Sequence, residues 1–236
     1  MQALSALIDR LGQLFSERDL IAIGVLAVAI WGMTMLIERA PRSRPSVSTL
    51  MSIYRGDWIR EIAARDVRIM DAQLLSSLRG GAGFFASTCL ISIGGVAALI
   101  GQADRLVSLV ADLGGEPSGR DAAVWEAKLL AILLLLVNAF LKFVWSHRLF
   151  AYCAVLLGAM PAAGSENLDA AIRRSVEVNA AAARAFNRGL RTIYFALAML
   201  AWFLGPEAMM AATIATAAML YRREFLSRSR KALLPQ

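Results

Sequence analysis

The chain has 236 residues, of which 58% are hydrophobic, and its mean hydropathy of +0.57 exceeds what a soluble domain of this size needs. Its net charge of +7 does not indicate nucleic-acid binding, because the basic residues stand in blocks beside apolar runs, where they set membrane topology and contact anionic lipid. The two cysteines are far apart and belong to no CxxC pair, so they predict neither a disulfide framework nor a metal site.

Several apolar runs reach the length of about 18–20 residues that crosses a hydrocarbon core about 30 Å thick. Lipid offers the backbone no hydrogen-bonding partner, so such runs must be helical. The sequence therefore predicts an all-α integral membrane bundle, a single domain over residues 1–236. We expect three long spans, a C-terminal broken span or helical hairpin, and two long amphipathic cytoplasmic helices. The first apolar run lacks a preceding basic region and is too long for a signal peptide, which predicts an uncleaved anchor.

The first part of the chain predicts one membrane span between two amphipathic helices. Apolar residues at helical spacing favour an interfacial helix over residues 2–15, and the first span follows over about 20–37. Pro41 and Pro45 prevent this helix from continuing smoothly. Residues 46–79 then repeat their apolar residues with a period close to 3.6 and interleave arginines, which predicts one long basic amphipathic helix.

The second span covers residues 80–101 and carries what we call the small-residue stripe. On a helical wheel the stripe consists of Gly83, Ser87, Gly94, Ala98 and Gly101. Small residues at this spacing let two helices approach closely in lipid, where van der Waals packing drives association. We therefore expect helix packing through the stripe. Residues 102–123 are polar and rich in glycine, which predicts a loop.

The third span, residues 124–146, is the most continuously apolar run and yet contains polar residues. One face of this helix, which we call the polar arc, holds Lys128, Ala131, Leu135, Asn138, Ala139, Lys142 and Ser146. We expect the arc to face the bundle interior and, most simply, the small-residue stripe. Asn138 lies near mid-bilayer by count, so it either serves a function or joins helices by a hydrogen bond. Lys142 either lines a path for anions, pairs with a carboxylate or extends its ammonium group to the headgroups.

The last part of the chain predicts a second amphipathic helix over residues 166–190, followed by an apolar stretch that is interrupted at Gly205-Pro206. Two short spans, 192–205 and 207–221, would form a hairpin, since glycine suits the residue after a helix end and proline suits the first helical position. We favour this hairpin over one kinked span. Glu207 then either caps the second short helix or acts in the outer leaflet.

The positions of lysine and arginine predict the orientation. Residues 38–80 contain eight arginines and 146–191 contain six, whereas 102–123 contain two. The tail from residue 222 contains five basic residues. The positive-inside rule then assigns the three basic segments to the cytoplasm. We expect a multi-pass protein of the bacterial inner membrane with a cytoplasmic C-terminal tail, whose basic face contacts anionic headgroups.

Patterns typical of catalytic or metal sites are missing from the sequence. His147 is the only histidine and projects away from the polar arc, and no HExxH, CxxC or P-loop pattern occurs. We therefore expect no enzyme activity and no cofactor. The leading hypothesis is a structural or accessory membrane component that self-associates or assembles with other membrane proteins. The alternative is a small channel or transporter with a polar path near Asn138, Lys142 and Glu207, because a broken helix with an acidic residue at its restart is typical of transporters.

A series of short motifs runs along the chain from about residue 20. They are Arg65-Asp66-Val67-Arg68-Ile69-Met70-Asp71-Ala72-Gln73, Phe84-Phe85-Ala86-Ser87-Thr88, Gly94-Gly95, Glu126-x-Lys128, Lys142-Phe143-x-Trp145-Ser146-x-Arg148, Gly158-Ala159-x-Pro161, Gly189-Leu190-Arg191 with Tyr194-Phe195, and Tyr221-Arg222-Arg223-Glu224-Phe225. In this order and spacing the chain resembles the integral membrane family known as domain of unknown function 599. The resemblance implies a multi-span protein of a kind found in bacteria and plants, and it implies no activity, substrate or catalytic residue.

Overall fold

The computed structural model describes residues 15–65, 67–112 and 122–234, and within these ranges it contains helices and no strands. This confirms the all-α prediction. Three of the helices, α2 (Glu17–Glu38), α4 (Ile69–Ile100) and α6 (Ala122–Gly158), are long and apolar enough to cross a membrane, as the sequence predicts. The interfacial helix expected over residues 2–15 lies outside the described residues except for Phe15.

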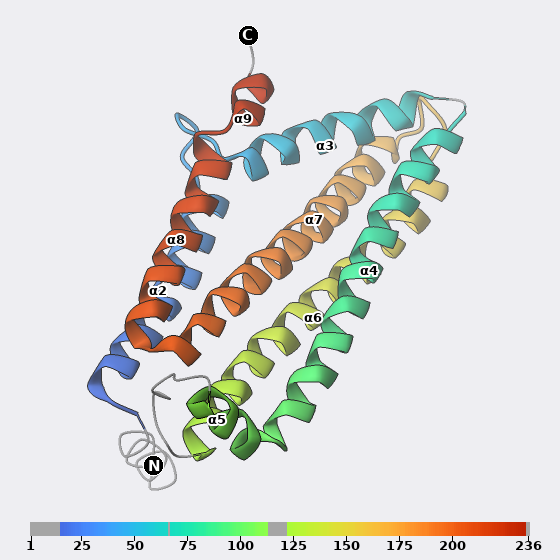
Figure 1. Cartoon of the computed structure of the whole chain (residues 1–236). Helices are drawn as coiled ribbons and strands as arrows, with labels where there is room; N and C mark the ends of the chain where they lie inside the picture. Colours follow the sequence, from blue (N-terminus) through green and yellow to red (C-terminus); the bar gives the residue numbers. More distant parts are fainter. Residues whose placement is uncertain (1–14, 66, 113–121, 235–236) are drawn as a thin grey trace, which may run out of the picture.

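The long helices form a pair and a row, which Figure 1 shows side by side. In the row, α6 packs between α4 and α7 (Leu168–Met199), whereas α2 pairs with α8 (Pro206–Phe225). The helix α3 (Val47–Ala64) crosses one end of the bundle, near α9 (Arg228–Leu233) (Figure 1). The short α5 (Ala103–Asp112) lies at the opposite end. We call the first of these ends the α3 end.

Serine caps determine where α2 and α3 begin. The Ser16 hydroxyl accepts a hydrogen bond from the Asp19 amide at 3.3 Å, and the Asp19 carboxylate accepts one from the Ser16 amide at 3.1 Å. Ser46 caps α3 in the same way through the Thr49 amide, and its hydroxyl also donates to the Ile37 carbonyl at 2.9 Å. Such caps satisfy amides that the first helical turn leaves free. The Ser46 cap therefore also joins the end of α2 to the start of α3.

The prediction of one continuous helix over residues 46–79 is wrong. The structure ends α3 at Ala64 and begins α4 at Ile69, so the last third of the predicted helix extends the second span instead. At the reversal, the buried Asp71 carboxylate accepts hydrogen bonds from Trp58 Nε1 and Arg65 Nη1, both at 2.8 Å. Because Asp71 belongs to α4, and Trp58 and Arg65 belong to α3 and its C-cap, these hydrogen bonds join the two helices and stabilise the sharp turn between them.

The prediction of a loop over residues 102–123 is wrong for Ala103–Asp112, which form α5. Its sequence alternates apolar and polar residues with helical spacing, and the glycines and proline of the segment come only after Asp112. The rest of that predicted loop, residues 113–121, lies outside the described residues.

The C-terminal part forms a hairpin with a longer first arm than predicted. The predicted elements 166–190 and 192–205 are one continuous helix, α7, extended by a 3₁₀ helix (Leu200–Leu204). Gly205, with a φ of 120°, then ends this arm, and Pro206 starts α8 at its first position. The chain reverses there, and α8 returns to the α3 end (Figure 1). The break at Gly205 thus has the location and the residue types that the sequence indicated.

Candidate functional site

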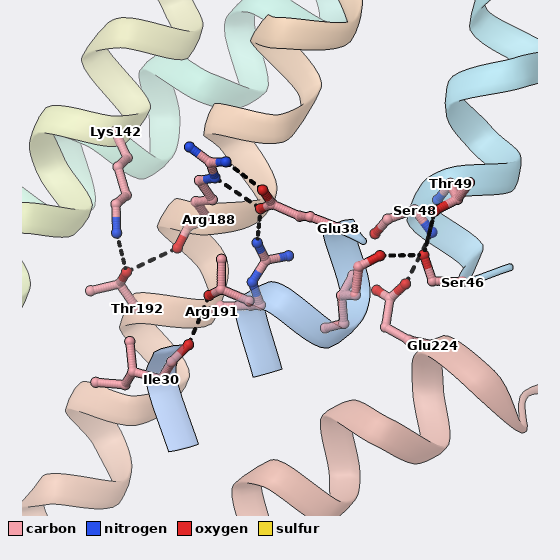
Figure 2. Close-up of polar contacts among 12 residues, drawn as sticks. Ile30, Glu38, Ser46, Ser48, Thr49, Lys142, Arg188, Arg191, Thr192 and Glu224 are labelled. Carbon is pink, nitrogen blue, oxygen red and sulfur yellow. Dashed lines mark hydrogen bonds and ion pairs between the residues drawn. The ribbon is translucent and has the colours of Figure 1, made fainter. Parts of the chain in front are cut away.

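A cluster of charged residues connects α2 to α7 near the α3 end. Glu38, the last residue of α2, accepts hydrogen bonds from the guanidinium groups of Arg188 and Arg191, with Arg188 Nε at 2.8 Å (Figure 2). The side chains of Arg191 and Glu38 are only 5% and 16% exposed. We call these three residues the Glu38 cluster. Because charges this buried need partners, the cluster makes the α2–α8 pair dependent on the row through a specific contact.

Lys142 of α6 lies next to this cluster. Its ammonium group donates to the Thr192 hydroxyl at 2.9 Å, and Thr192 in turn donates to the Arg188 carbonyl at 2.9 Å (Figure 2). Lys142 is half-buried, and in the described part of the chain its hydrogen-bond partner is a hydroxyl group and not a carboxylate. Its hydroxyl partner belongs to the same helix as the two arginines of the cluster.

The polar arc of α6 faces α7, and the expectation that it faces the small-residue stripe of α4 is wrong. Ser146 donates to the Ala182 carbonyl at 2.8 Å, and Lys128 donates to the Trp202 carbonyl at 3.1 Å. The arc thus makes hydrogen bonds to α7 and to its 3₁₀ extension. Asn138 is the exception within the arc, because its side chain is exposed.

The small-residue stripe lies mostly on the outside of the chain. Ser87, Gly94, Ala98 and Gly101 are exposed, and only Gly83 is partly buried, where an added Cβ would lie 3.3 Å from His147 Nδ1. The buried residues of α4 occupy another face and include Ala82, Ala86 and Cys89. Helix packing through the stripe therefore stays a prediction, and it concerns contacts with another chain.

Glu207 lies at the start of α8, at the other end of that helix from Glu224. Its carboxylate accepts a hydrogen bond from Arg18 at 3.0 Å, and both side chains are more than half exposed. Glu207 thus pairs with the start of α2. The three polar candidates are not brought together: Lys142 is next to the Glu38 cluster, Asn138 is on the surface of α6, and Glu207 is beside Arg18.

A cavity of about 540 Å³ borders the Glu38 cluster, and we call it the arginine cavity. It lies between the end of α2, the start of α3, the middle of α7, the end of α8 and the start of α9. Its charged lining residues are Arg55, Arg184, Arg223, Glu38 and Glu224, and its neutral polar ones are Ser48, Thr49, Ser52, Asn187, Ser227 and Ser229. Apolar side chains, among them Met51 and Leu190, complete the lining.

The two carboxylates of the arginine cavity already have donors. Glu38 is held by its two arginines, and Glu224, which is buried, accepts from the Ser48 amide at 3.0 Å and lies 3.9 Å from Arg223 Nη2. The cavity is therefore not a site for a cation, because each carboxylate is engaged and three guanidinium groups surround the space.

The three arginines that line the cavity differ in the hydrogen bonds that their guanidinium groups make. Arg55 donates to the Asn179 side chain at 3.2 Å, and burial lowers the pKa of its guanidinium below the ordinary value, although an arginine remains charged. Arg223 donates to the Tyr194 hydroxyl at 3.1 Å and lies over that ring. Arg184 is exposed and has no hydrogen bond or ion pair to any residue in the described part of the chain.

A second cavity of about 300 Å³ lies between the end of α3, the start of α4 and the end of α6. Its polar lining consists of Arg68, Asp71, Ser76 and Arg79. Arg79 donates to His147 Nε2 at 3.3 Å, so the only histidine contacts α4 and stays off the polar arc, as its position in the sequence indicated. In the described residues no three histidine, cysteine, aspartate or glutamate side chains lie close enough together to hold a metal ion.

Sequence reasoning missed the residues that form the Glu38 cluster and the arginine cavity. The available signal was the pair of arginines one turn apart, Arg188 and Arg191, directly before an apolar stretch, and a glutamate at the end of a span. These residues lie about 150 positions apart along the chain, as the separation of 153 between Glu38 and Arg191 illustrates. No local pattern connects residues at that distance.

Comparison with known families matches residues 21–229 to the family described as "Protein of unknown function, DUF599". Searches among curated proteins and among solved structures found no match. The matched region extends from the first span to the segment after α8, and so it includes the Glu38 cluster and every residue that lines the arginine cavity. The chain therefore belongs to the DUF599 family.

Proposed function

We propose that the protein is a non-enzymatic structural or accessory component of the bacterial inner membrane, which self-associates through the outer face of α4. The observation that carries this proposal is the exposed small-residue stripe. A Cβ added at Gly94 or Gly95 would meet no atom within 4 Å, so the helix surface is open there. Large apolar side chains such as Phe84 and Ile91 are also exposed on this helix. A second helix can fill the groove that small residues leave between them.

The orientation follows from the arginine-rich α3 end. The helix α3, the beginning of α7 and the short α9 all lie at this end, and each contains two arginines. The positive-inside rule then supports a cytoplasmic α3 end and a cytoplasmic tail. Anionic headgroups of the inner leaflet would contact the arginines at this end, which supplies the lipid partner of the protein.

The glycines of two spans allow a matched test of self-association. Gly94→Leu fills the stripe, and Gly24→Leu makes the same change at an exposed glycine of α2 where an added Cβ also meets nothing within 4 Å. Both variants should fold, since both positions are exposed and a Cβ at either one meets no atom within 4 Å. Single-molecule photobleaching in vesicles should find oligomers for the unaltered protein and for Gly24→Leu, and monomers for Gly94→Leu. A monomeric unaltered protein, or equal effects of the two substitutions, would refute the proposal.

A transport role is the second candidate, and the position of Lys142 favours it. Its half-buried ammonium group lies beside the Glu38 cluster, which borders the arginine cavity. Ionisable groups within membrane spans commonly belong to solute or ion paths. Lys142→Leu and Asn138→Leu in reconstituted vesicles should abolish solute flux if the path exists. A loss of thermal stability without any flux in the unaltered protein would support the structural role instead.

A further inference from the structure

The arginine cavity combines features that the proposed self-association does not use. It is bordered by five helices, it lies level with Ile37 and Glu38 at the end of a span, and three guanidinium groups contribute to its walls. These arginines come from three helices, namely α3, α7 and α8. The convergence of separate elements on one space distinguishes the cavity from a run of surface charges along a single helix.

Arginine side chains supply N–H donors to the cavity that two of the backbone amides at its edge do not. At the start of α3, the Ser48 amide is bonded to Glu224 and the Thr49 amide to Ser46, so these backbone groups are already used. By contrast, Arg184 keeps its whole guanidinium group unbonded within the described residues, and Arg55 donates one of its N–H groups to Asn179. A guanidinium group has five N–H donors in a planar fork, which matches phosphate oxygens in bidentate geometry.

The charged side chains that line the arginine cavity favour an anion as the ligand. Glu38 is neutralised by the two arginines of its cluster, and Glu224 faces Arg223. Among the charged side chains that line the cavity, Arg55 and Arg184 therefore remain in excess, and a bound anion would complete the charge balance. A carboxylate has two oxygens, whereas a phosphate group presents three or four to donors from different directions. Three arginines on three helices approach from different directions, and this arrangement matches the oxygens of a phosphate group better than the two oxygens of a carboxylate.

We propose that the arginine cavity binds a phosphate-bearing anion, either the headgroup of an anionic phospholipid or a free phosphate compound. The volume of about 540 Å³ leaves room for a glycerol unit beside the phosphate. The apolar lining side chains, such as Met51 and Leu190, supply a surface for the carbon part of the ligand. This inference is independent of the proposed self-association, because it rests on the cavity and is tested by ligand affinity.

Arg184→Gln tests the cavity with little effect on folding, since the side chain is exposed and unbonded. Arg173→Gln is the matched control: it removes the same charge from an exposed position of the same helix that lines neither cavity. Calorimetry on the full chain in a neutral detergent would use dioctanoyl phosphatidylglycerol, dioctanoyl phosphatidylcholine and glycerol phosphate as probes. Thermal melting of both variants would verify that their stability is unchanged.

We expect saturable binding of phosphatidylglycerol that Arg184→Gln weakens about tenfold or more and Arg173→Gln leaves unchanged, as the loss of a charge-assisted contact predicts. Glycerol phosphate distinguishes a free phosphate compound from a lipid headgroup as the ligand, and either result supports the proposal. If glycerol phosphate binds as well as the lipid, the phosphate group is sufficient for binding. If only the lipid binds, the cavity is a site for a lipid headgroup. Three results overturn the proposal. These are no binding of either anionic probe, equal weakening by the two substitutions, and equal affinity for phosphatidylcholine.

Discussion

The ring of Phe143 on α6 lies directly over the Cα of Gly189 on α7. A Cβ added at Gly189 would lie 2.8 Å from Phe143 Cζ, which is closer than real Cβ contacts allow. The ring has no room to withdraw, because it is fully buried and packs against the rings of Phe85 and Phe186 at centroid distances of 5.3 and 5.4 Å. This glycine therefore sets how closely the two helices approach, and the hydrogen bonds of the polar arc depend on that approach.

The first prediction concerns this contact. Gly189→Ala should lower the free energy of unfolding by about 1–3 kcal/mol, the usual effect of overpacking a tight core. Gly95→Ala is the control, because an added Cβ there meets nothing within 4 Å and alanine favours the helix. Thermal or denaturant unfolding in detergent compares the two. Equal stability of the two variants would mean that the ring of Phe143 can move.

The second prediction concerns the Glu38 cluster. Glu38→Gln removes the carboxylate that directly pairs with the buried Arg191 and leaves only the more distant charge of Glu224. The free energy of unfolding should therefore fall by about 2–4 kcal/mol, a range discounted because Arg188, the other partner of Glu38, is half exposed. Asp57→Asn is the control, since it breaks the exposed pair with Arg60 and should cost less than about 1 kcal/mol. Denaturant unfolding monitored by tryptophan fluorescence measures both changes, and similar losses would contradict a special role for Glu38.

The third prediction concerns the turn of the C-terminal hairpin. Gly205 has φ 120° and ψ 163°, a region that is essentially restricted to glycine. Gly205→Ala should therefore destabilise the hairpin by about 1–3 kcal/mol. Gly158→Ala serves for comparison, because Gly158 ends α6 without a positive φ and an added Cβ meets nothing within 4 Å. A melting temperature for Gly205→Ala equal to that of Gly158→Ala would show that the turn tolerates a side chain.

The fourth prediction concerns the side of the tail. Since α8 returns the chain to the α3 end, we expect a fluorescent protein fused after Gln236 to fluoresce and alkaline phosphatase fused there to be inactive. A fusion inserted between Asp112 and Ala122 should give the opposite result, because α5 and the beginning of α6 lie at the other end of the row. A periplasmic tail would contradict the proposed cytoplasmic location of the α3 end.

Local chemistry accounts for the parts of the fold that the sequence predicted. The all-α class follows from the backbone requirements of apolar runs in lipid, and the hairpin follows from glycine and proline at the one position that ends and restarts a helix. Proline and glycine act within a few residues, so their effect can be read without knowing the tertiary structure. The turn between α3 and α4 has no such residues. It depends on Asp71, which only the folded chain brings to Trp58, and the 3.6 period continues on both sides of it.

The sequence by itself determined that this protein is a helical membrane bundle with one polar face on its central helix. Periodicity states which residues share a face, and it does not state which helix covers that face. Only the tertiary structure decided that the polar arc contacts α7, that the small-residue stripe stays outside, and that Glu38 meets Arg191 at a separation of 153 residues. The physical reason is that such contacts are selected by the simultaneous packing and charge pairing of several helices, and no short segment contains that information.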